Sequence, residues 1–484
     1  MRRAAEMQRA GRSDQAKGLL QQVVRLDPAH YTALCALGQL NAGAGQIEFA
    51  LSLFERANQA RPDGFESLAL IARCQQQLGN ISAAAAATAR AADLQPNNDR
   101  VFFNLGVLRE QLGEFATARE AYGQAVRLNP GNLDAQSNLA MLSLSEAPDH
   151  AVALLANVHQ AKRGDPALIG AAKPLPNLPG NEQWHSKFKL KMELEQLEYL
   201  AQKGKLPEFA AGLPDALRSA LEDLADLDDD NESFRRQHPR HHWKSHWQLI
   251  NRLYNRTLYL PEPPVIDGPL INPDLDVQAL QDTYLNGDPQ LVVVDNFLTE
   301  PALAAIRDFC QEATIWHDLR RNYLGAYLTD GFANTLTLGI ANALKQSLPG
   351  IFKGHELAQG WGYKYGAAVT GIGMHADAAA VNCNFWITDD SANEDPDSGG
   401  LLVYDKEAPL DWDFETFNNN TEAMLEFLGD SIDTPVHIPH RANRIVIFNS
   451  NLFHRTDDIH FKDTFAARRY NITMLYGRRG RQTS

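Results

Sequence analysis

Four prolines recur at a fixed interval in the first third of the chain. Pro28, Pro62, Pro96 and Pro130 each stand 34 residues after the one before. A constant period of this length is typical of a helical repeat array, in which one supersecondary unit is stacked on the next. Proline cannot continue an α-helix, so each one closes the second helix of its unit. The spacing therefore predicts an all-α solenoid whose units bury their apolar faces against one another.

The residues between the prolines follow the same period. Counted back from Pro62 and from Pro130, matching offsets hold Leu34 and Phe102, Leu37 and Leu105, Gly38 and Gly106, Ala50 and Ala118, Phe54 and Tyr122, and Ala57 and Ala125. The corresponding residues before Pro96 are Leu68, Ile71, Ala72, Ala84 and Ala91. This pattern resembles the tetratricopeptide repeat (TPR) over about residues 1–166, with a degenerate last unit that is expected to act as a cap.

The resemblance implies a concave surface that holds a peptide or protein. Its expected members are Cys35, Gln39, Ala69, Arg73, Phe103 and Val107. They lack the Lys/Asn pattern of TPR domains that clamp a C-terminal carboxylate, so that ligand is not predicted. A purely structural or oligomerising array is the alternative, and a homodimer is a further possibility.

Charge and composition narrow the range of partners. The chain has 484 residues and a formal net charge of −15, which argues against nucleic acid as the main partner because phosphate binding needs a basic surface. No apolar run approaches the roughly 18 residues of a membrane span, so no membrane partner is expected. Four widely spaced cysteines show no CxxC pair, which favours a reducing, cytoplasmic setting.

Three regions are expected: a TPR solenoid (1–166), a linker with a helical connector (167–287), and a strand-rich domain (288–484). A linker rich in Pro, Gly and Asn covers 171–184. In the connector, His238, His242 and His246 stand four apart, a spacing that can bind metal on one helix face. Pro239 interrupts that helix and no carboxylate or Cys lies at ligand spacing, so packing is the preferred interpretation.

The last two hundred residues contain many short β-like runs separated by Gly, Asn and Asp, which predicts a sandwich or barrel. In "VNCNFWI" and "RYNIT" the side chains alternate between an apolar and a polar set. The polar set comprises Asn382, Asn384, Trp386, Arg469, Asn471 and Thr473. A polar face turned into a barrel would line a ligand cavity, whereas the same face turned outward would only meet water.

A His-Ala-Asp triplet supplies candidate metal ligands. In extended backbone, His375 and Asp377 project to the same side. His454, at the end of the expected strand "NRIVIFNSNLFH", would be the third ligand. Two His and one carboxylate with open positions favour Fe(II). Fifteen residues later comes Arg469, whose guanidinium can hold a carboxylate bidentately.

HxD at 375–377, "GGLLVY", "NRIVIFNSNLFH" and "RYNITMLYG" together resemble the Fe(II)/2-oxoglutarate-dependent dioxygenases, in particular the prolyl-hydroxylase-like branch, over about residues 288–478. The resemblance implies a double-stranded β-helix (jelly roll) with flanking helices, so the whole chain is expected to be multidomain α + β. It implies Fe(II) at His375, Asp377 and His454, and 2-oxoglutarate at Arg469. Further cosubstrate contacts are expected among Thr473, Asn384, Tyr363, Tyr365 and Trp386. O2 is the second cosubstrate, and ascorbate is a possible additional cofactor.

The predicted function is hydroxylation of a peptide or protein side chain presented by the TPR array. Two alternatives remain open at this point. One is the same oxygenase chemistry on a small molecule, with the TPR array used for assembly. The other is a TPR binding scaffold with an inactive oxygenase domain. The segment 405–434 is an insertion that could form a lid.

Overall fold

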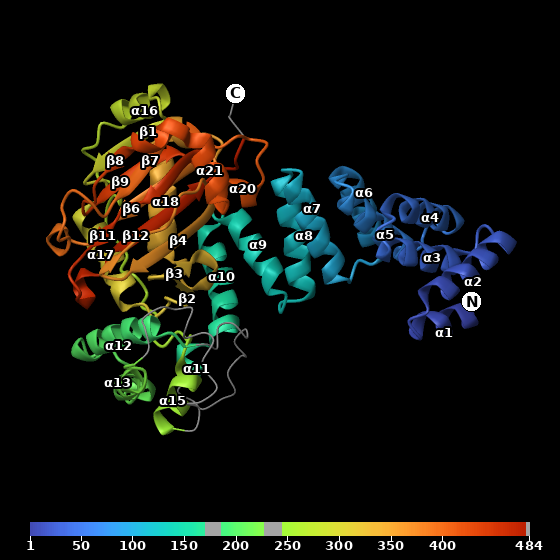
Figure 1. Ribbon diagram of the computed structural model, residues 1–484, viewed down its shortest axis with the longest axis horizontal. Helices are drawn as coiled ribbons and strands as arrows, with labels where there is room; N and C mark the ends of the chain where they lie inside the picture. Colours follow the sequence, from blue (N-terminus) through green and yellow to red (C-terminus); the bar gives the residue numbers. More distant parts are fainter. Residues whose placement is uncertain (170–184, 227–243, 481–484) are drawn as a thin grey trace. The chain divides into compact units, whose positions relative to one another are not determined.

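The computed structural model describes residues 1–169, 185–226 and 244–480. The chain divides into two compact units, Met1–Leu142 and Ser143–Ser484, whose helices and strands are labelled in Figure 1. The expected linker at 171–184 and the histidines His238 and His242 lie outside the described residues.

The first unit is built only of helices, in agreement with the predicted repeat. They are α1 (Arg2–Arg9), α2 (Ser13–Leu26), α3 (Tyr31–Gly43), α4 (Ile47–Ala60), α5 (Phe65–Gln77), α6 (Ile81–Leu94), α7 (Asp99–Gln111), α8 (Phe115–Leu128) and α9 (Leu133–Ser143), of which α9 reaches the boundary with the second unit. The helices α2, α4, α6 and α8 each end two residues before one of the four periodic prolines. The proline thus follows a finished helix, as its missing N–H requires.

Glycine and an aromatic ring pair at the centre of two repeats. A Cβ added to Gly106 would lie 2.6 Å from the ring of Tyr122, and a Cβ on Gly38 would collide with Phe54. Both rings are fully buried. The glycines of the repeat pattern are therefore required by close approach of the two helices, and any side chain there would overpack the hairpin.

The second unit begins with helices. They are α10 (Pro148–Arg163), α11 (Pro166–Ile169), α12 (Lys187–Gln202), η2 (Glu208–Ala210), α13 (Leu213–Asp223) and α15 (Ser245–Leu253). The last four of these surround an apolar cluster that includes the fully buried Trp247. The ring Nε2 of His246 lies 2.8 Å from a carboxylate oxygen of Asp223, which also accepts from the indole of Trp247 at 3.0 Å. His246 is thus engaged in packing and hydrogen bonding.

Three antiparallel sheets follow. Their strands are β1 (Leu291–Asp295), β2 (Asp318–Arg320), β3 (Tyr323–Tyr327), β4 (Leu357–Tyr365), β5 (Ala368–Val369), β6 (Val381–Trp386), β7 (Leu401–Glu407), β8 (Val436–Ile438), β9 (Arg444–Asn449), β10 (Leu452–Thr456), β11 (Ile459–His460) and β12 (Tyr470–Tyr476). The seven-stranded sheet has the order β1-β9-β6-β12-β4-β3-β2, the three-stranded sheet β10-β7-β8, and the smallest β11-β5. Over the described residues these sheets do not join into one closed barrel.

Helices cover one face of the seven-stranded sheet, and the three-stranded sheet packs on the other (Figure 1). The helices of this region are α16 (Val277–Asn286), α17 (Glu300–Glu312), α18 (Thr335–Ser347) and α19 (Pro349–Phe352). On the helical side, Tyr476 donates to a carbonyl of α18 at 2.9 Å. On the opposite side, Val403 and Leu452 of the small sheet pack with Trp386 and Phe448. The polar strand face is therefore buried between two sheets.

A buried polar cluster fixes α10 to the rest of this unit. Arg163 donates through Nε to both carboxylate oxygens of Asp330, at 2.9 and 3.1 Å, and His159 Nδ1 lies 3.1 Å from the same carboxylate. The other ring nitrogen of His159 lies 2.8 Å from the hydroxyl of Thr257, which is 3.0 Å from His317. The last helix of the degenerate unit is thus held by the sheet domain through its charged side chains.

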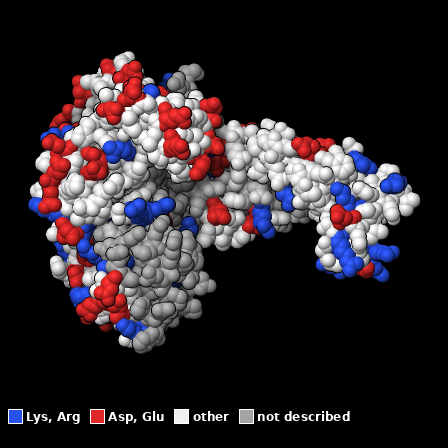
Figure 2. Space-filling view, viewed as in Figure 1, with Lys and Arg blue, Asp and Glu red and all other residues white. Residues whose placement is uncertain are grey.

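Acidic side chains predominate on the visible face of the second unit (Figure 2), as the sequence total of 60 Asp and Glu against 45 Lys and Arg predicts. Within the described part of the chain, none of the helices has the length and apolarity needed to cross a bilayer. All four cysteines are buried and unpaired with one another.

Candidate metal centre and carboxylate pocket

Two histidines face each other across a short antiparallel bridge. The backbone N–H of His375 donates to the carbonyl of His454 at 3.0 Å, and the N–H of His454 donates back at 2.9 Å. The expected single strand "NRIVIFNSNLFH" is wrong in one respect: it is two strands, β9 and β10, which belong to different sheets. The turn between them carries Ser450, whose carbonyl accepts the N–H of Asp377 at 3.0 Å. This turn brings His454 beside the triplet.

The three predicted ligands form a compact group. One ligand atom each from His375, Asp377 and His454 lie within 4.8 Å of one another. The Nδ1 atoms of His375 and His454 lie 2.8 and 3.0 Å from the carbonyls of Gly373 and Leu452. A carbonyl can only accept, so each Nδ1 carries the proton and each Nε2 keeps its lone pair. The Nε2 of His454 lies 3.4 Å from a carboxylate oxygen of Asp377.

The protonation states suit metal binding. Burial, and then the neighbouring His454, lower the pKa of His375 to about 4. Burial alone would raise the pKa of Asp377, but its contacts with His454, His375 and Asn382 outweigh burial and lower that pKa. At neutral pH the group therefore offers a neutral imidazole and a carboxylate, the forms that coordinate a cation.

A chain of side-chain hydrogen bonds leads away from Asp377. Asn382 donates to Asp377 Oδ2 at 2.5 Å, and Asn384 donates to Asn382 at 2.6 Å. The Oδ1 of Asn384 accepts from Thr473 at 2.8 Å and from Asn471 at 3.0 Å. The alternating polar residues of β6 and β12 therefore share one face, as predicted, and they orient the carboxylate of Asp377.

The insertion at 405–434 packs on the residue between the two ligands of the triplet. It contains α20 (Phe414–Asn418), α21 (Thr421–Leu428) and η5 (Gly429–Asp433). The N–H of Ala376 donates to the carbonyl of Phe417 at 2.9 Å, and the side chain of Asn418 donates to the carbonyl of Ala376 at 3.0 Å. Phe417 is buried in an apolar cluster with Ala376, Met424 and Phe453. The insertion thus supports the backbone that carries His375 and Asp377.

Arg469 is buried beside two glycines that precede β7. Its Nε donates to the carbonyl of Gly399 at 2.6 Å. Gly399 has a φ of +78°, and any Cβ on Gly400 would collide with the carbonyl of Ile438. Only glycine therefore allows this turn and the close approach of its backbone to β8. The turn also directs the carbonyl of Gly399 at the guanidinium of Arg469.

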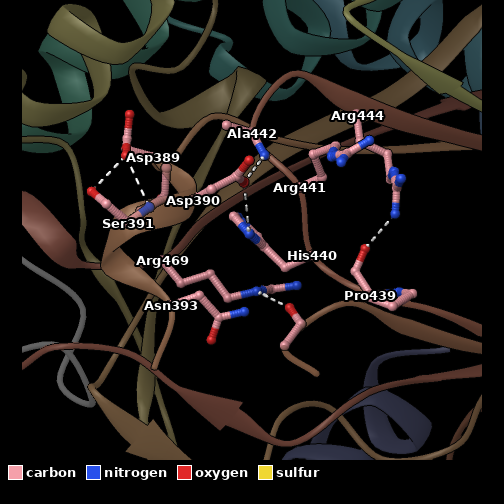
Figure 3. Close-up of polar contacts among 12 residues, drawn as sticks. Asp389, Asp390, Ser391, Asn393, Pro439, His440, Arg441, Ala442, Arg444 and Arg469 are labelled. Atoms are coloured by element: carbon pink, nitrogen blue, oxygen red, sulfur yellow. Dashed lines mark hydrogen bonds and ion pairs between the residues drawn. The ribbon is translucent and has the colours of Figure 1, made fainter. Parts of the chain in front are cut away.

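Arg469 and His440 lie close together in the pocket (Figure 3), and several buried ring and guanidinium nitrogens there have no hydrogen bond. The side chain of Arg469 is 1% exposed and has no ion pair with a carboxylate in the described residues, and its Nη1 has no hydrogen bond. The indole Nε1 of Trp386 and both ring nitrogens of His440 are likewise unsatisfied; the nearest carboxylate to His440, Asp390, is 3.8 Å away, too long for a hydrogen bond. Unmade hydrogen bonds of this kind are costly, so the cluster is suited to an anion.

Of Arg469, Trp386 and His440, only Arg469 is charged. Burial and the adjacent guanidinium lower the pKa of His440 to about 3, so this histidine is neutral and can donate one hydrogen bond. Burial also lowers the pKa of Arg469, partly offset by Tyr365. Arg468, the next residue along, is turned the other way, as strand alternation predicts, and pairs with Glu195 at 2.6 Å.

The predicted cosubstrate residues lie in three places. Near Arg469 lie Tyr365 and Trp386, whose ring centroids are 4.9 and 5.7 Å from its Cζ. Asn384 and Thr473 belong instead to the hydrogen-bond chain that ends at Asp377. Tyr363 stacks edge-on against Tyr323 at 4.8 Å, farther along the sheet.

Sequence reasoning did not single out His440, Gly399 or Gly400 as site residues. "GGLLVY" is one of the motifs of the family resemblance, but nothing in its letters indicates that its first carbonyls meet an arginine 70 residues later. His440 is a lone histidine in "HIPHRANR" without ligand spacing. Only the packing of the segment after β8 against β6 brings its ring to Trp386, at a centroid distance of 5.7 Å.

Comparison with known proteins identifies the first region. A family model described as tetratricopeptide repeat matches residues 6–65, 70–132 and 103–167. Among solved structures, one of MamA is 21% identical, covering 31% of this chain and 89% of that chain with a TM-score of 0.30. YrrB, described as a TPR protein with an unusual peptide-binding site, is 19% identical, with 32% and 79% covered and a TM-score of 0.29. A structure of pilF from Pseudomonas aeruginosa is 20% identical, covering 35% of this chain and 78% of that chain with a TM-score of 0.30.

No curated protein matches the chain. The family-model matches stop at residue 167, before the candidate metal centre. Where they lie, they agree with the helices and the proline period described above. The N-terminal region of this chain is an array of tetratricopeptide repeats, an architecture that supports binding of a protein or peptide partner.

Proposed function

We propose that this protein is an Fe(II)- and 2-oxoglutarate-dependent hydroxylase that acts on a peptide or protein side chain held by its TPR array. The observation that carries the proposal is the convergence of His375, Asp377 and His454, whose ligand atoms lie within 4.8 Å of one another. Two imidazoles and one carboxylate on one side of a cation leave positions open, the donor set that suits non-haem Fe(II). The paired sheets would then be a variant of the double-stranded β-helix.

The donor atoms fit a bound metal ion. Both histidines have their Nδ1 protons fixed on backbone carbonyls, which directs Nε2 outward. Asp377 keeps one oxygen on Asn382, an outer partner of the kind that orients metal-binding carboxylates. His375 is partly exposed while Asp377 and His454 are buried, so a substrate would approach past His375.

The unsatisfied donors of Arg469 fit the distal carboxylate of 2-oxoglutarate. A planar guanidinium with a free Nη1, 1% exposed and without an ion-pair partner in the described structure, gains most from a charged acceptor. His440 and Trp386 can each donate one more hydrogen bond there. Tyr365 and Trp386 flank the guanidinium and keep water from it.

When bound, Fe(II) with 2-oxoglutarate and O2 would supply the oxidation of a substrate C–H bond to an alcohol, with succinate and CO2 as coproducts. The chain would contribute binding and orientation. His375, Asp377 and His454 would hold the ion, and Arg469 would hold the distal carboxylate of the cosubstrate. The three-stranded sheet and the insertion around Phe417 would exclude water from the metal centre.

Two other functions remain in competition. The TPR matches favour a protein-binding scaffold, which requires no chemistry from the second unit. The same oxygenase chemistry on a small molecule would also use the metal centre, with the TPR array serving assembly.

The test is succinate formation by the full chain with Fe(II), O2 and 2-oxoglutarate. His375→Ala should abolish it, whereas His437→Ala should leave it unchanged, because His437 is an exposed histidine paired with Asp457. If the wild-type chain forms no succinate with or without candidate peptides, the scaffold function holds. If it hydroxylates a small molecule equally well without residues 1–142, the small-molecule function holds.

A further inference from the structure

One repeat departs from the packing rule of the array. At 34-residue spacing, Gly38 and Gly106 face Phe54 and Tyr122, whereas the corresponding residues of the intervening repeat are Ala72 and Thr88. The exchange is coupled. A methyl group on residue 72 can be accommodated only because residue 88 has lost its ring.

The missing ring leaves a cavity of about 270 Å³ between α5, α6 and α7. A single buried water needs only about 10–15 Å³ by the same measure, so the space can hold a side chain. Its floor includes Ala72, Thr88 and Leu108, which are all buried. The hydroxyl of Thr88 donates to the carbonyl of Ala84 at 2.8 Å, which leaves its methyl group to line the cavity. The floor is therefore apolar.

The rim of the cavity is polar and carries one unpaired positive charge. Arg73, Gln76 and Asn104 line it, and all three are exposed. Arg73 makes no ion pair with any described residue. On the neighbouring repeat, Arg109 is by contrast paired with Glu114. Arg73 and Val107 also belong to the positions predicted to face the concave side of the array.

We propose that this cavity is the specificity pocket of the array and takes one bulky aliphatic or aromatic side chain of an extended peptide, with an internal Asp or Glu beside it on Arg73. The chemistry of the site argues for this occupant: an apolar floor excludes a charged tip, and an uncompensated guanidinium at the rim favours an acid. The inference rests on the peptide-holding part of the proposed function and is independent of its oxidative chemistry.

A double variant tests the pocket without disturbing the fold. Ala72→Gly with Thr88→Phe rebuilds the Gly38–Phe54 pair of the preceding repeat, so the ring fills the cavity and the helices keep their native spacing. Its unfolding temperature should equal or exceed that of the wild type. Arg73→Gln removes only the rim charge.

The probe is a random dodecapeptide library displayed on phage, selected on the full-length chain without metal or 2-oxoglutarate. Enriched sequences should share a large apolar residue next to Asp or Glu. As synthetic labelled peptides they should bind the double variant at least tenfold more weakly and Arg73→Gln about threefold more weakly, the latter difference shrinking at high salt. Peptides that bind the filled variant with unchanged affinity, a consensus lacking the apolar residue, or no enrichment would each overturn the pocket. If the wild-type chain binds these peptides but forms no succinate, only the proposed oxygenase activity is refuted.

Discussion

Arg469 offers the sharpest test of the carboxylate pocket, because its neighbour in sequence is a natural control. Both Arg468 and Arg469 are almost fully buried. Arg468 already holds Glu195 and Asp463, whereas Arg469 donates to two backbone carbonyls, has no carboxylate partner among the described residues and has an unpartnered Nη1. Arg469→Met should therefore remove a ligand contact, and Arg468→Met should remove only internal ion pairs.

The magnitude follows from the burial of the pair that a ligand carboxylate would form. Removing one partner of a buried, hydrogen-bonded charge pair costs about 2–5 kcal/mol of binding free energy. At about 1.4 kcal/mol for each factor of ten, the Kd for 2-oxoglutarate should rise by roughly 30-fold to several thousand-fold. Arg469→Lys keeps the charge but loses the planar guanidinium, so its Kd for 2-oxoglutarate should lie between that of the wild type and that of Arg469→Met.

The assay is calorimetric titration of 2-oxoglutarate into the full chain loaded with Mn(II) in place of iron, with circular dichroism to check that each variant is folded. Arg468→Met should bind 2-oxoglutarate within about threefold of wild type. Equal affinities for wild type, Arg469→Lys and Arg469→Met would refute the assignment of the pocket. The same conclusion would follow if Arg468→Met lost as much affinity as Arg469→Met.

Three further predictions concern stability, each read as the midpoint of thermal unfolding. Asp330→Asn leaves Arg163 buried without the Asp330 carboxylate, which should cost about 3–5 kcal/mol of unfolding free energy and lower the midpoint of the second unit by roughly 6–10 °C. Pairing lowers the pKa of Asp330, so this loss of stability should be complete at neutral pH and should shrink as the pH falls below about 4. Lys364→Met should raise the midpoint, and more at pH 7 than at pH 10, since burial lowers the pKa of Lys364 to about 7 and the unfolded chain binds the extra proton between those values; an equal gain at both pH values would contradict this. Gly106→Ala forces a Cβ to 2.6 Å from the ring of Tyr122 and should cost about 1–3 kcal/mol in the first unit, so an unchanged midpoint would show that the hairpin adapts.

Several structural features of this protein can be predicted from short stretches of its sequence. The proline period and the Gly–aromatic offsets reflect contacts within one helical hairpin, so a window of 34 residues contains them. The HxD triplet is also local, and its polar neighbours on β6 and β12 alternate as any strand must. These features could be inferred because each depends on backbone geometry within a few residues.

The rest depends on contacts between distant segments. "NRIVIFNSNLFH" reads as one strand because its apolar run is barely interrupted, yet the chain turns at Ser450 and changes sheets. The short strands β2, β5 and β11 carry too few residues for a periodic signal. The cluster of His159, Thr257 and Asp330 joins positions up to 171 residues apart, a pairing that no local pattern encodes.

The hydrogen-bond chain that ends at Asp377 has a further consequence. An ionised carboxylate can only accept, so Asn382 must present its NH2 group, and its oxygen must then accept from Asn384. The oxygen of Asn384 in turn accepts from Thr473. Every amide dipole in the series thus has its positive end toward Asp377. The side-chain dipoles on β6 and β12 are therefore aligned, and they stabilise the negative charge of Asp377 whether or not a cation is bound.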